Sequence, residues 1–409
     1  MRYPFYKEGE KNMIIHSTRI YLEDGCKSGF LEIEDRKIVK FYPEGSDVKA
    51  DIDYGNNRII PGIFDTHNHG GFGYDLINQT TTEDILKYLK CQASFGVVNV
   101  LTSTSGLINI DLLANEAGKD QDGARILGIH AEGPWGARVG EKGVNTGYAK
   151  VDMEYAKKMV EDGKGYLKLA DVAPEVEGGL DAIRYFVSQG VYAGMYHTNA
   201  NYEQACAGID AGATNATHLG NVMTGIHHRD VGTLGACLLR DEVDCEMICD
   251  GLHISLPMIQ LYLKAKNHDQ LFMISDNVAY AGIPTGRYRG AFDAKGDRAF
   301  INVTDEGFVL SDTGRLSGSA KPVLYGIYNL VEKLGVPMEE CCKFFSYNPI
   351  RKYSDPSRKG SLKEGKDADF VVISDDYQAI ATYSEGRKVY DRDIDVIVCK
   401  QEFLDKIKL

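Results

Sequence analysis

Chemically active side chains follow the ends of apolar runs in this chain, and they do so repeatedly. A strand-like segment beginning at Ile59 reaches a His-x-His pair at His67 and His69. Further apolar runs are each followed by an acid or an imidazole, namely Glu132, His197, His218, His253 and Asp276. Side chains at the ends of parallel strands converge on one face of a (β/α)8 barrel, where such enzymes keep their chemistry. This feature therefore predicts a barrel whose site lies at the strand ends.

Strand and helix patterns alternate through the middle of the chain. After the first strand, the expected strands are Val97–Leu101, Arg125–Ile129, Tyr166–Leu169, Val191–Tyr196, Thr214–Thr217, Cys245–Cys249 and Leu271–Ser275. The segments with helical spacing between them include Thr82–Ser94, Met153–Asp162, Leu180–Gly190, Tyr202–Gly212 and Leu256–Ala265. Strands that alternate with helices imply a parallel sheet, and eight such units imply a closed barrel. We therefore predict an α/β protein with a (β/α)8 TIM barrel over residues 61–360.

Both ends of the chain read as short strands separated by turn residues. Gly29–Ile33 and Lys37–Phe41 are examples near the start, and Ala368–Ile373 and Ala379–Tyr383 are examples near the end. A barrel takes about 250 residues, so the chain of 409 residues leaves room for a smaller module. We predict a small β-sandwich domain formed jointly by residues 1–60 and 361–409.

Charge and composition narrow the classes of partner. The formal net charge of -13 argues against nucleic acid and anionic membranes, although a few local cations can still hold one phosphate. The nine cysteines are scattered without a regular framework, as is typical of reduced thiols. The N-terminus lacks the apolar core of a signal peptide, and no apolar run reaches membrane-spanning length. We therefore expect a cytoplasmic protein.

Two sets of these residues have the chemistry of a catalytic divalent-metal site. His67 and His69 stand two apart on a strand and point to the same side, so both can reach one ion. Glu132, His197 and His218 supply one carboxylate and two imidazoles, which leaves a position open for water. Each residue alone could be structural, as a turn histidine, a surface glutamate or a hydrogen-bonded core histidine. Their combination favours a metal site.

Asp276 ends the eighth strand. A carboxylate beside a metal site can take a proton from water and later deliver it to a leaving amine, although Asp at this position can also cap a helix.

A possible phosphate side is formed by Asn221, His228, Arg229 and His253. An arginine with neighbouring histidines suits a phosphate or carboxylate, and the alternative is a solvated basic turn. The chain has no phosphate-binding Gly-Lys-Ser/Thr loop, no Gly-x-Ser-x-Gly elbow and no Cys-x-x-Cys pair.

Taken in order, these segments resemble the N-acetylglucosamine-6-phosphate deacetylases of the amidohydrolase superfamily over nearly the whole chain. The matching segments are Pro61–Gly70, His130–Pro134, His197–Ala200, Ala211–Leu219, Asp250–His253, Ser275–Asp276, Leu316–Ser319, Asn348–Pro349 and Gly365–Asp369. The resemblance implies hydrolysis of the N-acetyl group of N-acetylglucosamine 6-phosphate to glucosamine 6-phosphate and acetate. It also implies a homodimer, because Arg229 would reach into the neighbouring subunit's site.

The resemblance implies a role for each matching residue. Glu132, His197 and His218 would hold the principal metal, His67 and His69 would help to bind a second one, and Asp276 would be the general base and acid. The residues that would contact the sugar or its phosphate are Val144, Asn221, Val222, His228, Arg229, His253, Leu316, Ser317 and Gly318. The cofactor would be one or two divalent ions, with zinc favoured and iron, manganese or cobalt compatible with the same ligands.

The sequence departs from the family pattern close to the pocket, at Tyr196, Gly220, Asn277 and the loop 135–141. These departures leave three alternatives open. The substrate could be the galacto epimer, N-acetylgalactosamine 6-phosphate. The enzyme could hydrolyse cyclic amides, as dihydroorotases do with a carboxylated lysine on the fourth strand, where Lys168 lies. The third alternative, a non-catalytic barrel that binds sugar phosphate, would lack a ligand or Asp276, and none is missing.

Overall fold

The computed structural model describes residues 13–137, 150–292, 298–312, 314, 316 and 318–409. Its largest feature is a barrel of eight parallel strands. The barrel strands are β6 (Ile63–Asn68), β9 (Val97–Thr104), β10 (Arg125–Trp135), β11 (Leu167–Val172), β12 (Tyr192–Met195), β13 (Ala213–Ala216), β14 (Asp244–Ile248) and β15 (Leu271–Ile274). They follow one another in chain order around the sheet, so each new strand pairs with the one before it.

The first and last barrel strands meet just beyond their regular parts. The amide of Asp276 donates to the carbonyl oxygen of His67 at 2.8 Å, and the amide of His69 donates to the carbonyl oxygen of Asn277 at 2.6 Å. The predicted (β/α)8 fold is therefore confirmed. Because the closing hydrogen bonds lie among His67, His69 and Asp276, closure of the barrel itself brings these three residues together.

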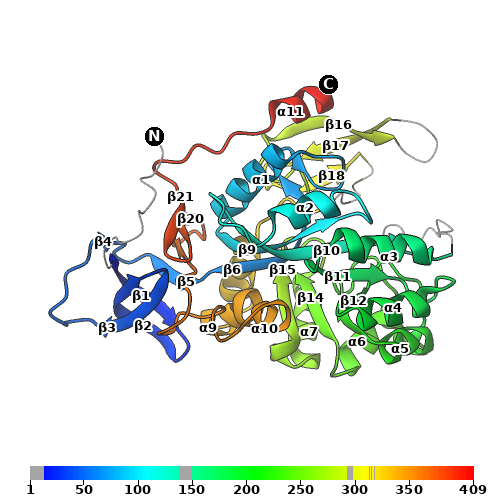
Figure 1. Ribbon diagram of the computed structural model, residues 1–409, viewed down its shortest axis with the longest axis horizontal. Coiled ribbons are helices and arrows are strands. Elements are labelled where there is room, and N and C mark those ends of the chain that lie inside the picture. The colour runs from blue at the N-terminus through cyan, green and yellow to red at the C-terminus, as the bar shows by residue number, and fades with distance from the viewer. Residues whose placement is uncertain (1–12, 138–149, 293–297, 313, 315, 317) are drawn as a thin grey trace.

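Helices cover the outside of the barrel (Figure 1). Those that follow the first seven strands are α1 (Thr82–Ser94), α2 (Ile110–Glu116), α3 (Met153–Asp162), α4 (Gly179–Ser188), α5 (Tyr202–Asp210), α6 (Gly232–Leu239) and α7 (Leu256–Ala265). After them come η1 (His268–Gln270), α8 (Val323–Tyr328), η2 (Asn329–Lys333), α9 (Met338–Cys342), η3 (Lys343–Tyr347) and α10 (Asn348–Tyr353). Local capping sets several boundaries. Thr81 accepts from the third residue of α1, and Asn201 and Gln204 form a capping box at α5.

A second sheet combines both ends of the chain. Its strands are β1 (Met13–Leu22), β2 (Gly25–Glu34), β3 (Lys37–Pro43), β4 (Ile52–Asp53), β5 (Arg58–Pro61), β19 (Phe370–Ile373), β20 (Ala379–Ser384) and β21 (Arg387–Asp391). The N-terminal and C-terminal parts join where β5 runs antiparallel to β19, with Ile60 opposite Val371. The sheet has its own apolar core, in which the rings of Phe370 and Tyr383 stack 4.3 Å apart. Figure 1 shows this sheet beside the barrel.

The chain passes from the small sheet into the barrel at Gly62. The apolar run that begins at Ile59 is therefore divided between β5 and β6. The amide of Gly62 donates to the carbonyl oxygen of Asp369 at 3.0 Å. A Cβ atom at this position would lie 2.7 Å from Val98 Cγ2, which is too close for any other residue. A glycine at the crossing lets the two sheets approach closely.

The segment that follows β15 contains elements for which the sequence offered no clear pattern. β16 (Gly286–Phe292), β17 (Arg298–Val303) and β18 (Val309–Ser311) form an antiparallel sheet. A further short pair lies much earlier in the chain, soon after β6, where β7 (Gly70–Gly71) pairs with β8 (Tyr74–Asp75). The last helix, α11 (Gln401–Ile407), packs near β16 rather than on the small sheet, as Figure 1 shows. The proposed division into 1–60 with 361–409 and 61–360 stays a prediction.

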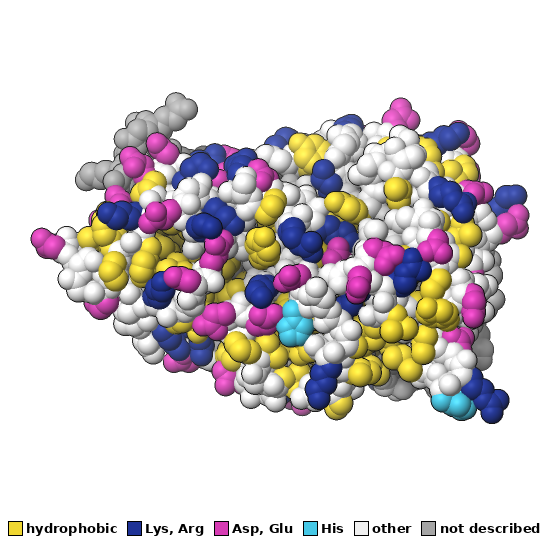
Figure 2. All heavy atoms as spheres, turned by 90° about the horizontal axis from the view of Figure 1, so that it is seen from below, with side chains coloured by type: hydrophobic (Ala, Val, Ile, Leu, Met, Phe, Trp, Pro, Cys, Tyr) yellow, Lys and Arg dark blue, Asp and Glu magenta, His cyan; other side chains and the backbone are white. Residues whose placement is uncertain are grey.

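The surface carries acidic and basic side chains mixed with apolar ones, and Figure 2 shows this mixture on the face seen from below. Among the described residues, no helix combines the length and the apolar character needed to cross a membrane. The cytoplasmic location stays a prediction.

Candidate active site

Six of the residues singled out in the sequence meet at the carboxyl ends of the barrel strands. They are His67 on β6, His69 directly after it, Glu132 on β10, His197 after β12, His218 after β13 and Asp276 after β15. A parallel barrel places all strand ends of one sense on one face, so residues far apart in sequence become neighbours there. The predicted grouping of these six residues is what the structure shows.

Glu132, His197 and His218 form the first ligand group. Glu132 Oε1 lies 3.0 Å from His218 Nε2 and 3.5 Å from His197 Nε2. One ligand atom of each residue lies within 4.8 Å of the others, which is the spacing that a single ion requires. His218 is buried, whereas Glu132 and His197 are partly accessible. A carboxylate with two imidazoles and an open side is typical of catalytic rather than structural metal sites.

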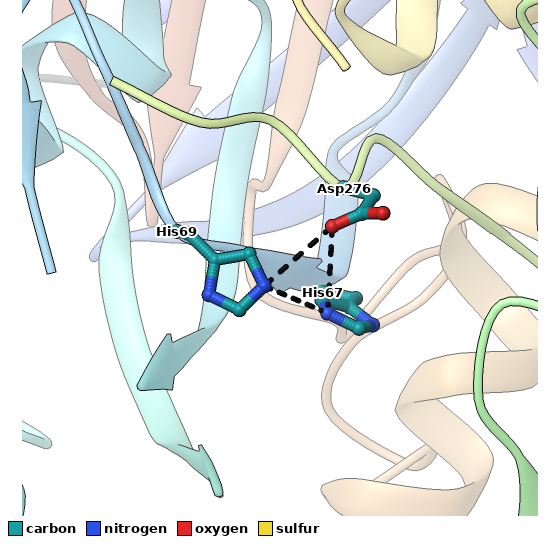
Figure 3. A group of neighbouring side chains, drawn as sticks. All are labelled: His67, His69 and Asp276. Atoms are coloured by element: carbon teal, nitrogen blue, oxygen red, sulfur yellow. Dashed lines mark hydrogen bonds and ion pairs between the residues drawn. The ribbon is translucent and has the colours of Figure 1, made fainter. Parts of the chain in front are cut away.

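His67 and His69 form the second ligand group, and Asp276 lies beside them (Figure 3). The Nε2 atoms of the two imidazoles lie 3.0 Å apart. Asp276 Oδ1 lies 3.6 Å from His67 Nε2 and 3.5 Å from His69 Nε2. Figure 3 shows the carboxylate of Asp276 turned toward both rings. The proposed proton carrier therefore stands beside the proposed ligands.

Glu132 connects the two ligand groups. Its Oε1 atom faces His197 and His218, and its Oε2 atom lies 3.2 Å from His69 Nε2. His67 Nε2 is 3.8 Å from Glu132 Oε1. One carboxylate with an oxygen toward each group has the arrangement of a bridging ligand.

The donor set fits a divalent metal. His69 Nδ1 lies 3.2 Å from the carbonyl oxygen of Ser103, and a carbonyl only accepts, so Nδ1 donates there. In the neutral ring, His69 Nε2 then carries a lone pair that points toward His67 Nε2 and the carboxylates of Glu132 and Asp276. Lone pairs and negative oxygens that converge in this way are complementary to a cation. His218 Nδ1 is buried and has no hydrogen-bond partner among the described residues.

The pKa values of the site residues reflect the same concentration of charge. Burial raises the pKa of Glu132, but hydrogen bonds from His197, His218 and His69 outweigh it and hold that pKa well below its usual range. Burial lowers the pKa of His218, but Glu132 outweighs it and raises that pKa to about 9. Burial raises the pKa of Asp276, although His69 and His218 oppose the shift. A more basic carboxylate suits a group that must accept a proton.

Three of the ligand and acid residues have unusual backbone conformations. The φ angles are 39° at His197, 36° at His218 and 52° at Asp276. Residues other than glycine seldom adopt positive φ, and each costs on the order of 1–3 kcal/mol. Each is the second residue beyond the end of a barrel strand, where the chain leaves the strand direction. Such strain is concentrated at functional sites, which agrees with the roles assigned to these residues.

A layer of buried polar residues beneath the site was not singled out from the sequence. His130 Nε2 lies 2.7 Å from Asp171 Oδ2, and His67 Nδ1 lies 3.2 Å from Glu246 Oε2. Asp65 accepts from the hydroxyl of Ser275 at 2.5 Å. Burial raises the pKa of both Asp65 and Glu246 to about 7. The alternation of side chains along a strand could have identified His130, because it stands two residues from Glu132 and so shares its face of β10.

The residues proposed to contact substrate are only partly gathered around this site. The side chain of His253 is 4% exposed, and its Nδ1 is held by Asp250 Oδ2 at 2.6 Å. Asn221 and Val222 follow His218, and the carbonyl oxygen of Val222 accepts from the amide of Thr198 at 3.2 Å. Gly318 lies beside Val278, two residues beyond Asp276.

The remaining substrate residues lie elsewhere or cannot be placed. His228 and Arg229 stand on an exposed turn outside the six-residue group, where Arg229 Nε donates to His228 Nε2 at 3.1 Å. Leu316 pairs with Leu310. Val144 and Ser317 lie outside the described residues.

Lys168 is not part of the site. Its Nζ atom donates to the carbonyl oxygen of Gly165, near the start of β11, at 3.3 Å. On the same strand, Asp171 faces the barrel interior, where it bonds His130. Because Lys168 is three residues away on the strand, it lies on the opposite face. A carboxylated lysine that bridges two metals, as the cyclic-amide alternative requires, has no counterpart in this arrangement.

Comparisons with known proteins identify the family of this chain. The model of the amidohydrolase family matches residues 58–391. The chain is 33% identical to the N-acetylglucosamine-6-phosphate deacetylase of Vibrio furnissii over 353 residues, which cover 83% of this chain and 85% of that protein. It is 30% identical to the N-acetylgalactosamine-6-phosphate deacetylase of Escherichia coli O157:H7, covering 91% and 98% of the two chains.

A solved structure of a related deacetylase has a similar fold. A mutant of N-acetyl-D-glucosamine-6-phosphate deacetylase from Mycobacterium smegmatis, in complex with N-acetyl-D-glucosamine-6-phosphate, is similar with a TM-score of 0.81 and 27% identity. The match covers 93% of this chain and all of the other. The chain thus belongs to the amidohydrolase family and is an enzyme of the kind represented by the N-acetylglucosamine-6-phosphate deacetylases.

Proposed function

We propose that this protein hydrolyses the N-acetyl group of an amino-sugar 6-phosphate, foremost N-acetylglucosamine 6-phosphate, to glucosamine 6-phosphate and acetate. The observation that carries the proposal is the position of Asp276. Its carboxylate stands within 3.6 Å of the two imidazoles of the second ligand group. Glu132 connects that group to the first. A base beside two joined ligand groups is what amide hydrolysis by water needs.

In this proposal the two ligand groups hold one or two divalent ions, zinc foremost and iron, manganese or cobalt otherwise. When bound, such an ion polarises the amide carbonyl and makes water more acidic. Asp276 accepts a proton from water as the hydroxide oxygen bonds to the acetyl carbon. Asp276 then returns the proton to the sugar nitrogen as the carbon–nitrogen bond breaks. The balance is one water consumed, one acetate released and one amine formed.

The phosphate is proposed to lie against Asn221, the backbone at Val222 and His253. Asp250 fixes the ring of His253 through Nδ1, so its Nε2 is left to face a ligand. Val144, Leu316, Ser317 and Gly318 would contact the sugar. His228 and Arg229 stand exposed, away from their own site. We propose that Arg229, with His228 beside it, acts on the neighbouring site of a homodimer.

N-acetylgalactosamine 6-phosphate is the second candidate substrate. The 30% identity to a deacetylase with that name makes it a candidate, beside the 33% identity to an N-acetylglucosamine-6-phosphate deacetylase. The site also differs from the usual family pattern at Tyr196, whose ring packs 4.8 Å from the ring of His197. The hydroxyl of Tyr196 fills the space beside Gly133, where a Cβ atom would meet it at 2.1 Å. A bulky residue next to a ligand can alter which sugar epimer the pocket accepts.

The test is acetate release from a panel of N-acetylated sugars after reconstitution with metal. The panel contains the gluco and galacto epimers, each with and without the 6-phosphate, and one cyclic amide. We expect turnover of a 6-phosphate, with kcat/KM highest for the gluco epimer. A higher kcat/KM for the galacto epimer would instead identify N-acetylgalactosamine 6-phosphate as the substrate. Turnover of the cyclic amide alone, or of no member of the panel, would contradict the proposal.

A further inference from the structure

Glu246 lies on β14 in the barrel interior, and it contacts both ligand groups from beneath. Its side chain is fully buried. Its Oε2 atom lies 3.2 Å from Nδ1 of His67 in the second group and 3.3 Å from the backbone nitrogen of His218 in the first. Its Oε1 atom accepts from the hydroxyl of Thr66 at 3.4 Å. One carboxylate therefore touches a ligand residue of each group, and at His67 it does so through the ring nitrogen that faces away from the other ligand atoms.

The chemistry of these contacts fixes the state of His67. Oε2 of Glu246 already acts as an acceptor, because the backbone N–H of His218 can only donate to it, so we infer that His67 Nδ1 carries the proton and also donates to this oxygen. The other ring nitrogen, Nε2, is then left with its lone pair. That nitrogen faces His69, Glu132 and Asp276. A carboxylate behind a ligating imidazole sets its tautomer, orients the ring and makes it a better donor to a cation.

His67, His130 and Glu246 also stand close enough to be considered as an ion site of their own. Hydrogen bonds already engage His130 on both sides. Its Nε2 lies 2.7 Å from Asp171 Oδ2 and its Nδ1 lies 3.2 Å from Ser103 Oγ. All three side chains are 0% exposed. The group is therefore a hydrogen-bonded layer that supports the site.

We propose that Glu246 is a positioning residue that sets the tautomer of His67 and the backbone position of His218, and thereby tunes both ligand groups. The proposal rests on the proposed function in one respect, namely that the two ligand groups hold metal. Its first part, the proton on His67 Nδ1, is a property of the metal-free protein and is measured without substrate or ion.

Two substitutions separate positioning from packing. Glu246→Met keeps the size of the side chain and removes the acceptor. Glu246→Gln keeps a carbonyl oxygen, which can take the place of Oε2 while the amide group faces Thr66, whose hydroxyl can accept. The matched control is Asp171→Asn. Asp171 is equally buried and bonds an imidazole, but that imidazole belongs to neither ligand group.

The first readout is the nitrogen NMR signal of His67 in metal-free protein labelled at histidine, assigned by its loss in His67→Asn. We expect Nδ1 to be protonated in the wild type, in Glu246→Gln and in Asp171→Asn. In Glu246→Met the proton should move, at least in part, to Nε2. A wild-type His67 protonated at Nε2 would overturn the proposal without reference to any variant that fails to fold.

The second readout is zinc affinity, measured by competition with a chelator. Glu246→Met should weaken binding about 10–100-fold, which is the usual effect of losing such a partner. Glu246→Gln and Asp171→Asn should stay within a few-fold of the wild type. Wild-type affinity in Glu246→Met would overturn the proposal. Absence of zinc binding by the wild type would instead contradict the metal-dependent function, and the NMR result would still decide the tautomer.

Discussion

Asp276 combines three properties that single it out among the acidic residues of the barrel. It is 7% exposed, it stands at positive φ, and two imidazole nitrogens face its Oδ1 atom. The alternative role as a helix cap is not supported, because the residues after it form the turn that leads to β16. Its geometry therefore fits a proton carrier better than a structural role.

Replacing Asp276 by Asn should leave the fold and the metal content intact while lowering kcat by about 10²–10⁴, the usual contribution of a general acid–base group. Asn preserves the shape of the side chain but cannot accept the proton from water. Turnover of the amino-sugar phosphate and elemental analysis of metal content are measured on the same preparation. Near-wild-type turnover, or loss of the metal together with the activity, would contradict the role as proton carrier.

The sequence revealed the site residues at the strand ends, but it did not reveal the buried acids that bond to residues of the site from within the strands. His67, Glu132 and Asp276 each end an apolar run, and that pattern is visible without a structure. Asp171 and Glu246 lie inside strands, and which side chain they meet depends on the register and closure of the barrel. A buried acid within a strand was the available signal, but its partner could not be read from the sequence.

The elements of the barrel were predicted well where local pattern determines them. α1, α3 and α7 have the bounds that helical spacing suggested, because each shows a one-sided apolar stripe. α6 carries no such stripe. Nearly all of its residues are buried, two are glycines, and packing on several sides stabilises it. α11 and β16 depend on one another across more than a hundred residues, so neither has a clear local signal.

Lys359 forms the centre of a buried ion network between the small sheet and the barrel. Its Nζ atom lies 2.8 Å from Asp369, 3.1 Å from Asp367 and 3.1 Å from Glu385. Arg125 of β10 reaches Glu385 at 3.2 Å. Burial alone would raise the pKa of Asp369, but Lys359 outweighs it and lowers that pKa. Burial alone would lower the pKa of Lys359, and the surrounding carboxylates raise it.

Replacing Lys359 by Met should lower the free energy of unfolding at pH 7 by about 3–5 kcal/mol, because it leaves buried carboxylates without their cation. The folded pKa of Asp369 is depressed, so its contribution to stability is present above the ordinary value of 3.8. That contribution is lost as pH falls through the lower, folded value. The difference between wild type and variant, measured by urea unfolding, should therefore shrink below about pH 4.

Lys366→Met is the matched control for this prediction. Lys366 is similarly buried, but it donates to the carbonyl oxygen of Lys359 and the hydroxyl of Ser361. Its ion pair with Glu23, at 3.5 Å, is with an exposed carboxylate, and such pairs contribute little to stability. Its deficit in stability should be smaller and should change little in acid. A deficit for Lys359→Met that is equal at pH 7 and below pH 4 would show that packing, rather than charge, accounts for the effect.

At the scale of the whole molecule, the two chain ends meet through β5 and β19, as the strand patterns near each terminus suggested. The sequence did not indicate that the last residues return to the barrel. Lys400 binds Asp84 of α1 at 2.7 Å, and its amide donates to the carbonyl oxygen of Phe72 at 2.8 Å. Phe72 lies three residues beyond His69, so the end of the chain supports the loop beside the second ligand group.

The homodimer proposed for the whole protein predicts complementation between two impaired variants. Arg229→Ala should lower kcat/KM for the 6-phosphate roughly tenfold to more than a hundredfold, since a charge-assisted phosphate contact contributes about 1.5–3 kcal/mol. The unphosphorylated sugar should be barely affected. Mixing Arg229→Ala with Asp276→Asn protomers should restore part of the activity, because one of the two sites in a mixed dimer then has both native residues.

Two results would contradict this part of the proposal. Equal loss for phosphorylated and unphosphorylated sugars would exclude phosphate recognition by Arg229. Failure to restore activity, with exchange of subunits verified by mass spectrometry of differently tagged protomers, would exclude a site shared between subunits.

In the proposed function, amide hydrolysis depends on metal held by Glu132, His197 and His218. Its most direct test is acetate release from N-acetylglucosamine 6-phosphate by chelator-treated protein during titration with zinc, with His197→Ala in parallel. We predict no turnover without metal, a rise to a plateau at one or two equivalents for the wild type, and no comparable rise for the variant. Full turnover by the metal-free protein, or a wild-type titration curve for His197→Ala, would exclude hydrolysis that depends on metal held by these three residues.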